Sequence, residues 1–341
     1  MNTHLTRSFR TYFVESRFIS IVFSVIIVGI RFLMYLKKGL PDAPEYVNND
    51  VWRLIDSVIS DLPILSFFGS TLLIFIISVL VSELNLRFGV IRLRTSMPFY
   101  IPLLLFSVHP VFLRMTPDLI ALVFVLWSLF PLFATYQFQR SHKYAFQFTA
   151  LLAMGSIFQI YTLLFVPIWL IALKALDEIN FRSFFASMFG LIIVFWIVFS
   201  MYVFGDNIAG FTEPFKQLAV IYDFRSAPDF NVPQWGFVGT IILLVIIFLT
   251  ADTKQIVRER SFTKKVLVFN LFVVSFVILM QVLYYTHTLF FLYVGIALVS
   301  MVISHFYTNS TRNLQVYSYI VFMALLIVYI LINLFTDFSP F

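Results

Sequence analysis

Long apolar runs separated by short polar segments make up most of the chain between residues 18 and 335. Each run holds roughly 16 to 24 residues that are apolar on all sides, instead of an apolar stripe on one face. An α-helix of about 20 apolar residues crosses a hydrocarbon core of roughly 30 Å. This pattern predicts an all-α, polytopic transmembrane helix bundle that forms a single integral membrane domain over residues 1–341.

We expect about 11 transmembrane helices on this criterion. Two short runs meet at residues 159–161, and if both were re-entrant the number of spans would fall to nine. The predicted helices cover residues 18–36, 60–83, 97–113, 117–137, 145–160, 162–176, 183–204, 235–251, 266–284, 288–305 and 315–335.

The composition supports a membrane protein and narrows the possible chemistry. Only 12% of the residues are charged and 61% are hydrophobic, whereas soluble domains carry about 25% charged residues. The chain has no cysteine, which excludes disulfides, thiolate nucleophiles and cysteine-ligated metals. No Gly-rich phosphate loop, nucleophile elbow or zinc-protease motif is present. The five histidines are scattered, so neither a metal site nor a cofactor is predicted; a divalent cation held by exterior carboxylates stays open.

The distribution of Lys and Arg predicts the orientation of the bundle. Most of the 23 basic residues fall in the N-terminal segment 1–17 and in the loops after every second helix, including residues 252–265. Because such loops stay in the cytoplasm, we expect the N-terminus there, in a bacterial inner membrane. Residues 1–17 would either lie on the membrane surface as a basic amphipathic segment or form a solvated tail. The net charge of +6 then reflects topology, and no nucleic acid partner is expected.

Two long polar segments, residues 37–59 and 205–234, would lie in the periplasm, where functional groups on loops are most accessible. The first contains Asp42 and Asp50, which are candidate general bases toward a hydroxyl group. The second contains Arg225, a candidate for binding phosphate or carboxylate. An ordinary hydrated loop has the same composition, so that interpretation stays open for both segments.

Further candidate substrate-binding residues lie near the predicted outer ends of helices. Arg31 lies in the outer part of the first helix, where a cation either extends toward the surface or binds an anionic head group. The short turn 107–118 adds His109, Arg114 and Asp118. Asp118 follows a proline at a helix start and is equally suited to cap that helix. His109 is equally suited to be a hydrogen-bonded packing residue.

This series of acidic exterior segments resembles the layout of the C-type membrane glycosyltransferases, which use polyprenyl-phosphate sugars. The resemblance covers the first eight predicted helices and is one of layout. It implies a catalytic aspartate in the first exterior loop, at Asp42 or Asp50, a second acidic turn at Asp118, and a long exterior loop at 205–234. It also implies a polyprenyl-phosphate-linked sugar as a binding partner.

Two short sequence patterns resemble an uncharacterised family of polytopic bacterial inner-membrane proteins. One is Arg-Thr-Ser-Met-Pro at residues 94–98, at the start of a predicted helix, and the other is Gly-Ser at residues 155–156. This resemblance implies the same helical fold and location, and it implies nothing about activity.

Three functions stay open at this point. The first is glycosyl transfer from, or handling of, lipid-linked envelope precursors at a periplasmic working face. The second is a non-enzymatic membrane anchor or assembly subunit that binds an envelope protein partner. The third is a flippase or transporter, which needs a polar path between helices and is disfavoured by the few charges within them. In all three the protein is surrounded by membrane lipids.

Overall fold

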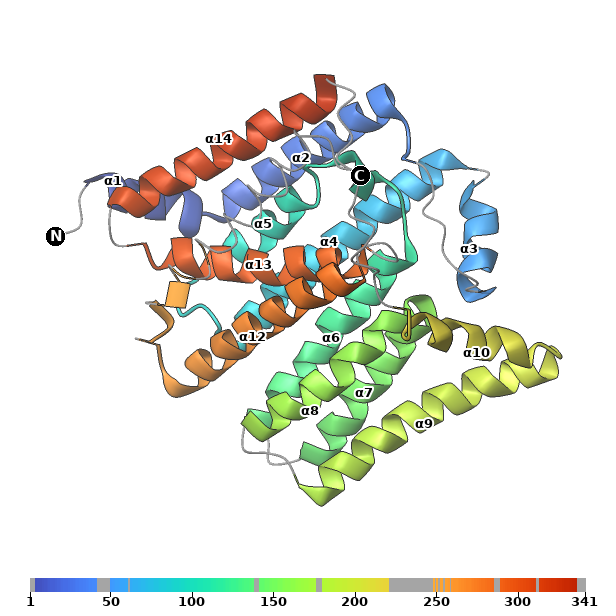
Figure 1. Cartoon of the computed structure of the whole chain (residues 1–341). Helices are drawn as coiled ribbons and strands as arrows, with labels where there is room; N and C mark the ends of the chain where they lie inside the picture. The colour runs from blue at the N-terminus through green and yellow to red at the C-terminus, as the bar shows by residue number, and fades with distance from the viewer. Residues whose placement is uncertain are drawn as a thin grey trace.

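The computed structural model describes residues 4–41, 50–60, 62–137, 141–175, 180–220, 252–253, 255–257, 259–284, 289–310 and 313–335, with residues 248 and 250. All regular structure in these residues is helical, which confirms the predicted all-α class (Figure 1). Seven helices of this described part are long and apolar enough to cross a membrane. They are α2 (Arg17–Lys38), α4 (Pro63–Phe88), α6 (Pro117–Gln137), α9 (Phe181–Phe204), α12 (Ser261–Leu283), α13 (Phe290–Thr308) and α14 (Asn313–Phe335).

Shorter helices complete the bundle. They are α5 (Met97–Leu105), α7 (Ser141–Phe158) and α8 (Phe165–Ala175), with the 3-10 segments η2 (Pro110–Leu113) and η3 (Ile160–Leu164).

The short runs predicted at 145–160 and 162–176 coincide with α7 and with η3 plus α8. The helix predicted at 235–251 lies outside the described residues, apart from residues 248 and 250.

The continuous helix predicted for residues 97–113 is wrong. α5 ends at Leu105, the chain turns, and only the short η2 is helical again. Pro102 inside α5 lacks the backbone donor of a regular turn. Pro110 requires an extended residue before it, and His109 accordingly has φ −121° and ψ 140°. The apolar run therefore lies where it was predicted, but its prolines stop the helix halfway.

The N-terminal segment packs on the bundle. α1 (His4–Phe9) continues into a π-helical turn, η1 (Arg10–Val14), and α1 contacts α14. Val14 is fully buried, and its carbonyl accepts a hydrogen bond from the Ser96 N–H (3.1 Å). The solvated tail considered from the sequence is therefore wrong, since this segment is a packed helical element.

Both long polar segments contain a helix. α3 (Asp50–Ser60) occupies the second half of the segment 37–59, and α10 (Ile208–Gln217) lies in the segment 205–234. The first segment, expected to be a loop, is an amphipathic helix over its last part.

The turns between helices gather at two opposite ends of the bundle. One end holds α3, α10 and the turn around Arg114, and we call it the Arg114 end (Figure 1). The other holds η1, the ion pair of Arg92 with Glu259 (2.8 Å), and the last turn of α13 with His305. We call it the His305 end.

Gly190 lets α9 approach α7, its main neighbour. A Cβ atom at Gly190 would lie 2.6 Å from the Phe146 carbonyl oxygen and 3.1 Å from the Ala150 nitrogen. Both are backbone atoms, so a larger residue would have to push the helices apart. Small residues at such contacts are typical of membrane helices, because lipid supplies no hydrophobic drive for association. Gly190 is therefore the position at which α9 packs closely against α7.

We expect Gly190→Ala to destabilise the protein by roughly 1–3 kcal/mol, because overpacking separates α9 from α7. Gly29→Ala on α2 is the matched control, since a Cβ there meets nothing within 4 Å. Thermal unfolding in detergent, followed by size-exclusion chromatography, compares the two variants. Equal unfolding midpoints would contradict a tight contact at Gly190.

Candidate functional site

The break between α5 and η2 places irregular backbone inside the bundle. A helix that ends at Leu105 leaves its last carbonyl groups without the amide partners of a continuous helix. In hydrocarbon each unsatisfied carbonyl costs several kcal/mol. Irregular backbone at membrane depth is therefore stable only where other parts of the protein bind it, and here the neighbouring helices do so.

Arg31 of α2 binds both sides of this break. Nη1 donates to the Phe106 carbonyl (3.0 Å) and Nη2 donates to the Phe112 carbonyl (3.0 Å). Nη2 also donates to Ser70 Oγ (2.8 Å) and Nε donates to Thr71 Oγ1 (3.2 Å), both on α4. In the described part of the chain no carboxylate contacts this guanidinium. Carbonyl and hydroxyl oxygens therefore satisfy it.

The Arg31 side chain is fully buried, so the outward extension considered from the sequence is wrong. The planar guanidinium instead connects α2, α4 and the two ends of the broken helix, a geometry that its fixed fork of donors allows. Binding of an anionic head group by Arg31 remains a prediction.

Two further side chains bind the same turn. Ser66 Oγ of α4 accepts a hydrogen bond from the Met115 N–H (3.0 Å). Asn333 Nδ2 of α14 donates to the Val108 carbonyl (3.1 Å). Together with Arg31, these contacts fix the turn between α5 and α6 against three long helices.

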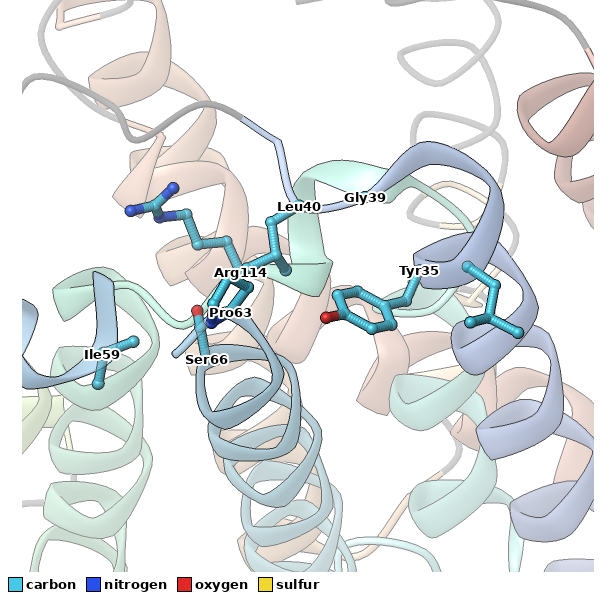
Figure 2. A pocket seen from close by; sticks show the side chains of 8 residues that line it. Tyr35, Gly39, Leu40, Ile59, Pro63, Ser66 and Arg114 are labelled. Carbon is cyan, nitrogen blue, oxygen red and sulfur yellow. The ribbon is translucent and has the colours of Figure 1, made fainter. Parts of the chain in front are cut away.

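A pocket of about 540 Å³ lies beside this turn, where α2, α3 and α4 meet (Figure 2). α2 ends here because Gly39 takes a φ of 70°, a conformation that favours glycine, and its N–H bonds the Tyr35 carbonyl (2.9 Å). α4 begins at Pro63, and the pocket lies between this helix start and the end of α2. The lining residues are Tyr35, Leu36, Gly39, Leu40, Ile59, Pro63, Ser66 and Arg114.

Arg114 brings a cation to the margin of this pocket, whose lining is both polar and apolar. Figure 2 shows its side chain extending away from Leu40 and Tyr35, while the Tyr35 hydroxyl points toward the middle of the pocket. Nη1 donates to the Pro41 carbonyl (3.3 Å), and Nη2 lies 3.9 Å from Asp56 Oδ1. The Arg114 side chain is 18% exposed and that of Asp56 is 35% exposed. These two contacts do not saturate the five N–H donors of a guanidinium, so an incoming anion can bind.

Asp118 and His109 are buried, and neither lines the pocket. Asp118, in the first turn of α6, accepts a hydrogen bond from Gln159 Nε2 (2.5 Å). His109 Nδ1 accepts from the Val111 N–H (3.1 Å), and its ring stacks on Tyr329 (6.2 Å between centroids). The contacts of Asp118 are those of a buried carboxylate at a helix start, and the contacts of His109 are those of a packing residue.

The structure leaves three predicted site residues without a described side chain. Asp42 and Arg225 lie outside the described residues, and Asp50 begins α3 with a side chain that is not described. Their roles remain predictions. Among the predicted binding residues, Arg114 alone lines the described pocket, and Arg31 binds the adjoining turn.

A second buried polar cluster, at the His305 end, was missed by sequence reasoning. His305 Nδ1 lies 2.7 Å from Asp252 Oδ1, and Asn309 Nδ2 lies 3.0 Å from His305 Nε2. Burial raises the pKa of the Asp252 carboxyl, and its hydrogen bond with His305 opposes that shift. Glu259 lies 3.7 Å from the same imidazole and pairs with Arg92.

This cluster connects the segment around Asp252 to α13. Among the described residues no group of three or more potential ligands could hold a metal ion. The i, i+4 spacing of His305 and Asn309 is a sequence signal for their contact. The separation of 53 positions between Asp252 and His305 gives no such signal.

We expect Arg31→Lys to destabilise the protein by roughly 2–4 kcal/mol although the charge is kept, because one ammonium group cannot reach both carbonyls of the break. Arg87→Lys, at an exposed position of α4, is the control. Thermal unfolding and hydrogen exchange of residues 106–113 report the effect. If both variants unfold at the same temperature, Arg31 does not hold the break.

No protein-family model matches the chain, and neither a curated protein nor a solved structure matches it. The two family resemblances seen in the sequence therefore remain predictions.

Proposed function

We propose that the chain is a multi-pass protein of the bacterial inner membrane with about 11 transmembrane helices. Its N-terminus is in the cytoplasm and the Arg114 end faces the periplasm. The support is the bias of Lys and Arg toward the His305 end, where Arg10, Arg92 and Lys264 lie, because basic loops are retained on the cytoplasmic side.

At the Arg114 end, the protein binds the phosphate head group of a membrane lipid. The observation that carries this proposal is a guanidinium at the margin of a pocket whose other lining residues include four apolar side chains. Phosphate accepts paired hydrogen bonds from a guanidinium, while the hydrocarbon chain of the same lipid lies along the apolar side chains. The apolar lining residues are Leu36, Leu40, Ile59 and Pro63.

A lipid-linked envelope precursor, such as a polyprenyl-phosphate-linked sugar, belongs to this ligand class. In the enzymatic form of the proposal, Asp42 or Asp50 removes the proton from an acceptor hydroxyl. The hydroxyl oxygen bonds to the sugar as the bond between the sugar and the lipid phosphate breaks. Arg114 stabilises the negative charge on the departing phosphate. In the sequence Asp42 directly follows Pro41, whose carbonyl binds Arg114.

A non-enzymatic role in an envelope complex is the second candidate. Among the described residues that line the pocket there is no carboxylate. Binding of a lipid phosphate without chemistry therefore has equal support from these residues. Such a subunit would hold a lipid-linked precursor for a partner that binds the exterior segments.

We expect the protein in nanodiscs to bind a polyprenyl phosphate, and the neutral polyprenol of equal length to bind much more weakly. Arg114→Gln should weaken phosphate binding about tenfold, equivalent to roughly 1.4 kcal/mol for a charge-assisted contact. Lys216→Gln removes an exposed cation of α10 at the same end and should have no effect. Equal binding of the alcohol, or unchanged binding by Arg114→Gln, would refute the proposed site.

The double variant Asp42→Asn, Asp50→Asn separates the two candidates. An enzyme should lose transfer of a labelled sugar from its polyprenyl phosphate while still binding the lipid, because only the general base is removed. Chromatography of the lipid-linked and transferred label measures this. Transfer at the wild-type rate rules out these two aspartates as the base. Binding of the lipid by the wild-type protein without any transfer of label favours the non-enzymatic role.

A further inference from the structure

α3 is a wall of the pocket and carries the carboxylate that contacts Arg114. Ile59 of α3 lines the pocket, and Trp52 is buried against the rest of the protein (Figure 2 shows Ile59 on a ribbon apart from the long helices). Asp56, one turn before Ile59, lies 3.9 Å from Arg114. α3 therefore differs from the other helices that line the pocket. It belongs to the polar segment 37–59, whereas α2 and α4 are long apolar helices.

The remaining surface of α3 has two different exposed sides. Leu54 (74% exposed) and Val58 (59% exposed) are four residues apart and therefore lie on the same side. Arg53 and Ser57 are also four residues apart and exposed. Because successive helical residues are rotated by about 100°, the apolar pair and the polar pair face different directions. A helix with a buried, an apolar and a polar side is typical of the membrane–water interface.

Lipid is the occupant that the surroundings of the apolar side favour. α3 packs on α4, whose first turns expose Ile64, Leu65 and Phe68. α4 is long and apolar enough to cross a membrane, so in the proposed orientation these exposed side chains face hydrocarbon. Leu54 and Val58 add apolar surface at the same end of α4, while the polar side of α3 reaches head groups and water.

We propose that α3 lies in the outer lipid–water interface as a movable wall of the pocket, and that the Asp56 carboxylate competes with a lipid phosphate for the Arg114 guanidinium. This inference rests on the proposed binding of a lipid phosphate. The ligand is a lipid whose phosphate reaches Arg114 while its chain passes beside Ile59.

The Asp56–Arg114 contact has the properties of a replaceable partner. It is long and partly exposed, and ion pairs of this kind contribute little to stability. A phosphate, like a carboxylate, can bind a guanidinium through two parallel hydrogen bonds, and the single 3.9 Å contact with Asp56 lacks that geometry. Once phosphate binds, α3 loses its link to Arg114 and is held by its buried side and by lipid.

Asp56→Asn tests the competition. We expect the variant to bind a polyprenyl phosphate roughly two- to fivefold more tightly than wild type in nanodiscs, because the competing carboxylate is removed. Asp56→Glu keeps the charge and should bind like wild type. Asp206→Asn removes an exposed charge from the turn between α9 and α10, outside the pocket lining, and should also bind like wild type. Equal affinities of Asp56→Asn and Asp206→Asn overturn the role of Asp56.

Site-specific nitroxide labels test the position of α3. The chain has no cysteine, so Leu54→Cys and Ser57→Cys can each be labelled without background. We expect the label at 54 to collide with oxygen dissolved in the lipid and the label at 57 to collide with a water-soluble paramagnetic complex. Polyprenyl phosphate should increase the mobility of both labels. Equal accessibility at the two positions, or spectra unchanged at saturating lipid, overturns the movable interfacial wall.

These outcomes are distinguishable from failure of the proposed function. If wild type binds polyprenyl phosphate no better than polyprenol, the lipid-phosphate site is wrong and the role of Asp56 is wrong with it. If binding depends on Arg114 but is the same in Asp56→Asn, the site stands and the competition by Asp56 is wrong.

Discussion

The hydrogen bonds between Arg31 and the broken helix are the interaction on which the rest of the structure depends. Neither a guanidinium nor irregular backbone is stable by itself in hydrocarbon, because each has polar groups that lipid cannot satisfy. Here each satisfies the other, since the guanidinium binds the carbonyls of Phe106 and Phe112. The arginine and the break are therefore a single structural unit, and loss of either leaves the other with unpaired polar groups.

The same unit positions the candidate site. Because the break is held against α2 and α4, the turn that follows it carries Arg114 to the place where these helices separate. Gly39 ends α2 there. α3, which belongs to the polar segment 37–59, lines the pocket with Ile59. The pocket thus combines a cation from a short turn with apolar side chains near helix ends, and an amphiphilic phosphate needs both.

The all-α class was predictable because continuous apolar runs of spanning length have one stable backbone solution in lipid. The break within residues 97–113 was missed although Pro102 and Pro110 lie in that run. Its contacts with Arg31 and Asn333 were not predictable, because they join residues 75 and 225 positions apart. Arg114 was predicted as a candidate binding residue from its charge and its place in a turn, and it lines the pocket. Its contact with Asp56 was not predicted, because that acid lies in a segment expected to be a loop.

A structure of the protein in lipid nanodiscs with a bound polyprenyl phosphate, determined by electron cryomicroscopy, tests the central claim most directly. The account predicts phosphate density within hydrogen-bonding distance of the Arg114 guanidinium. It also predicts hydrocarbon density along Leu36, Leu40 and Ile59, with Asp56 displaced. Density for the phosphate at another place, with the pocket beside Arg114 empty at saturating lipid, would contradict it.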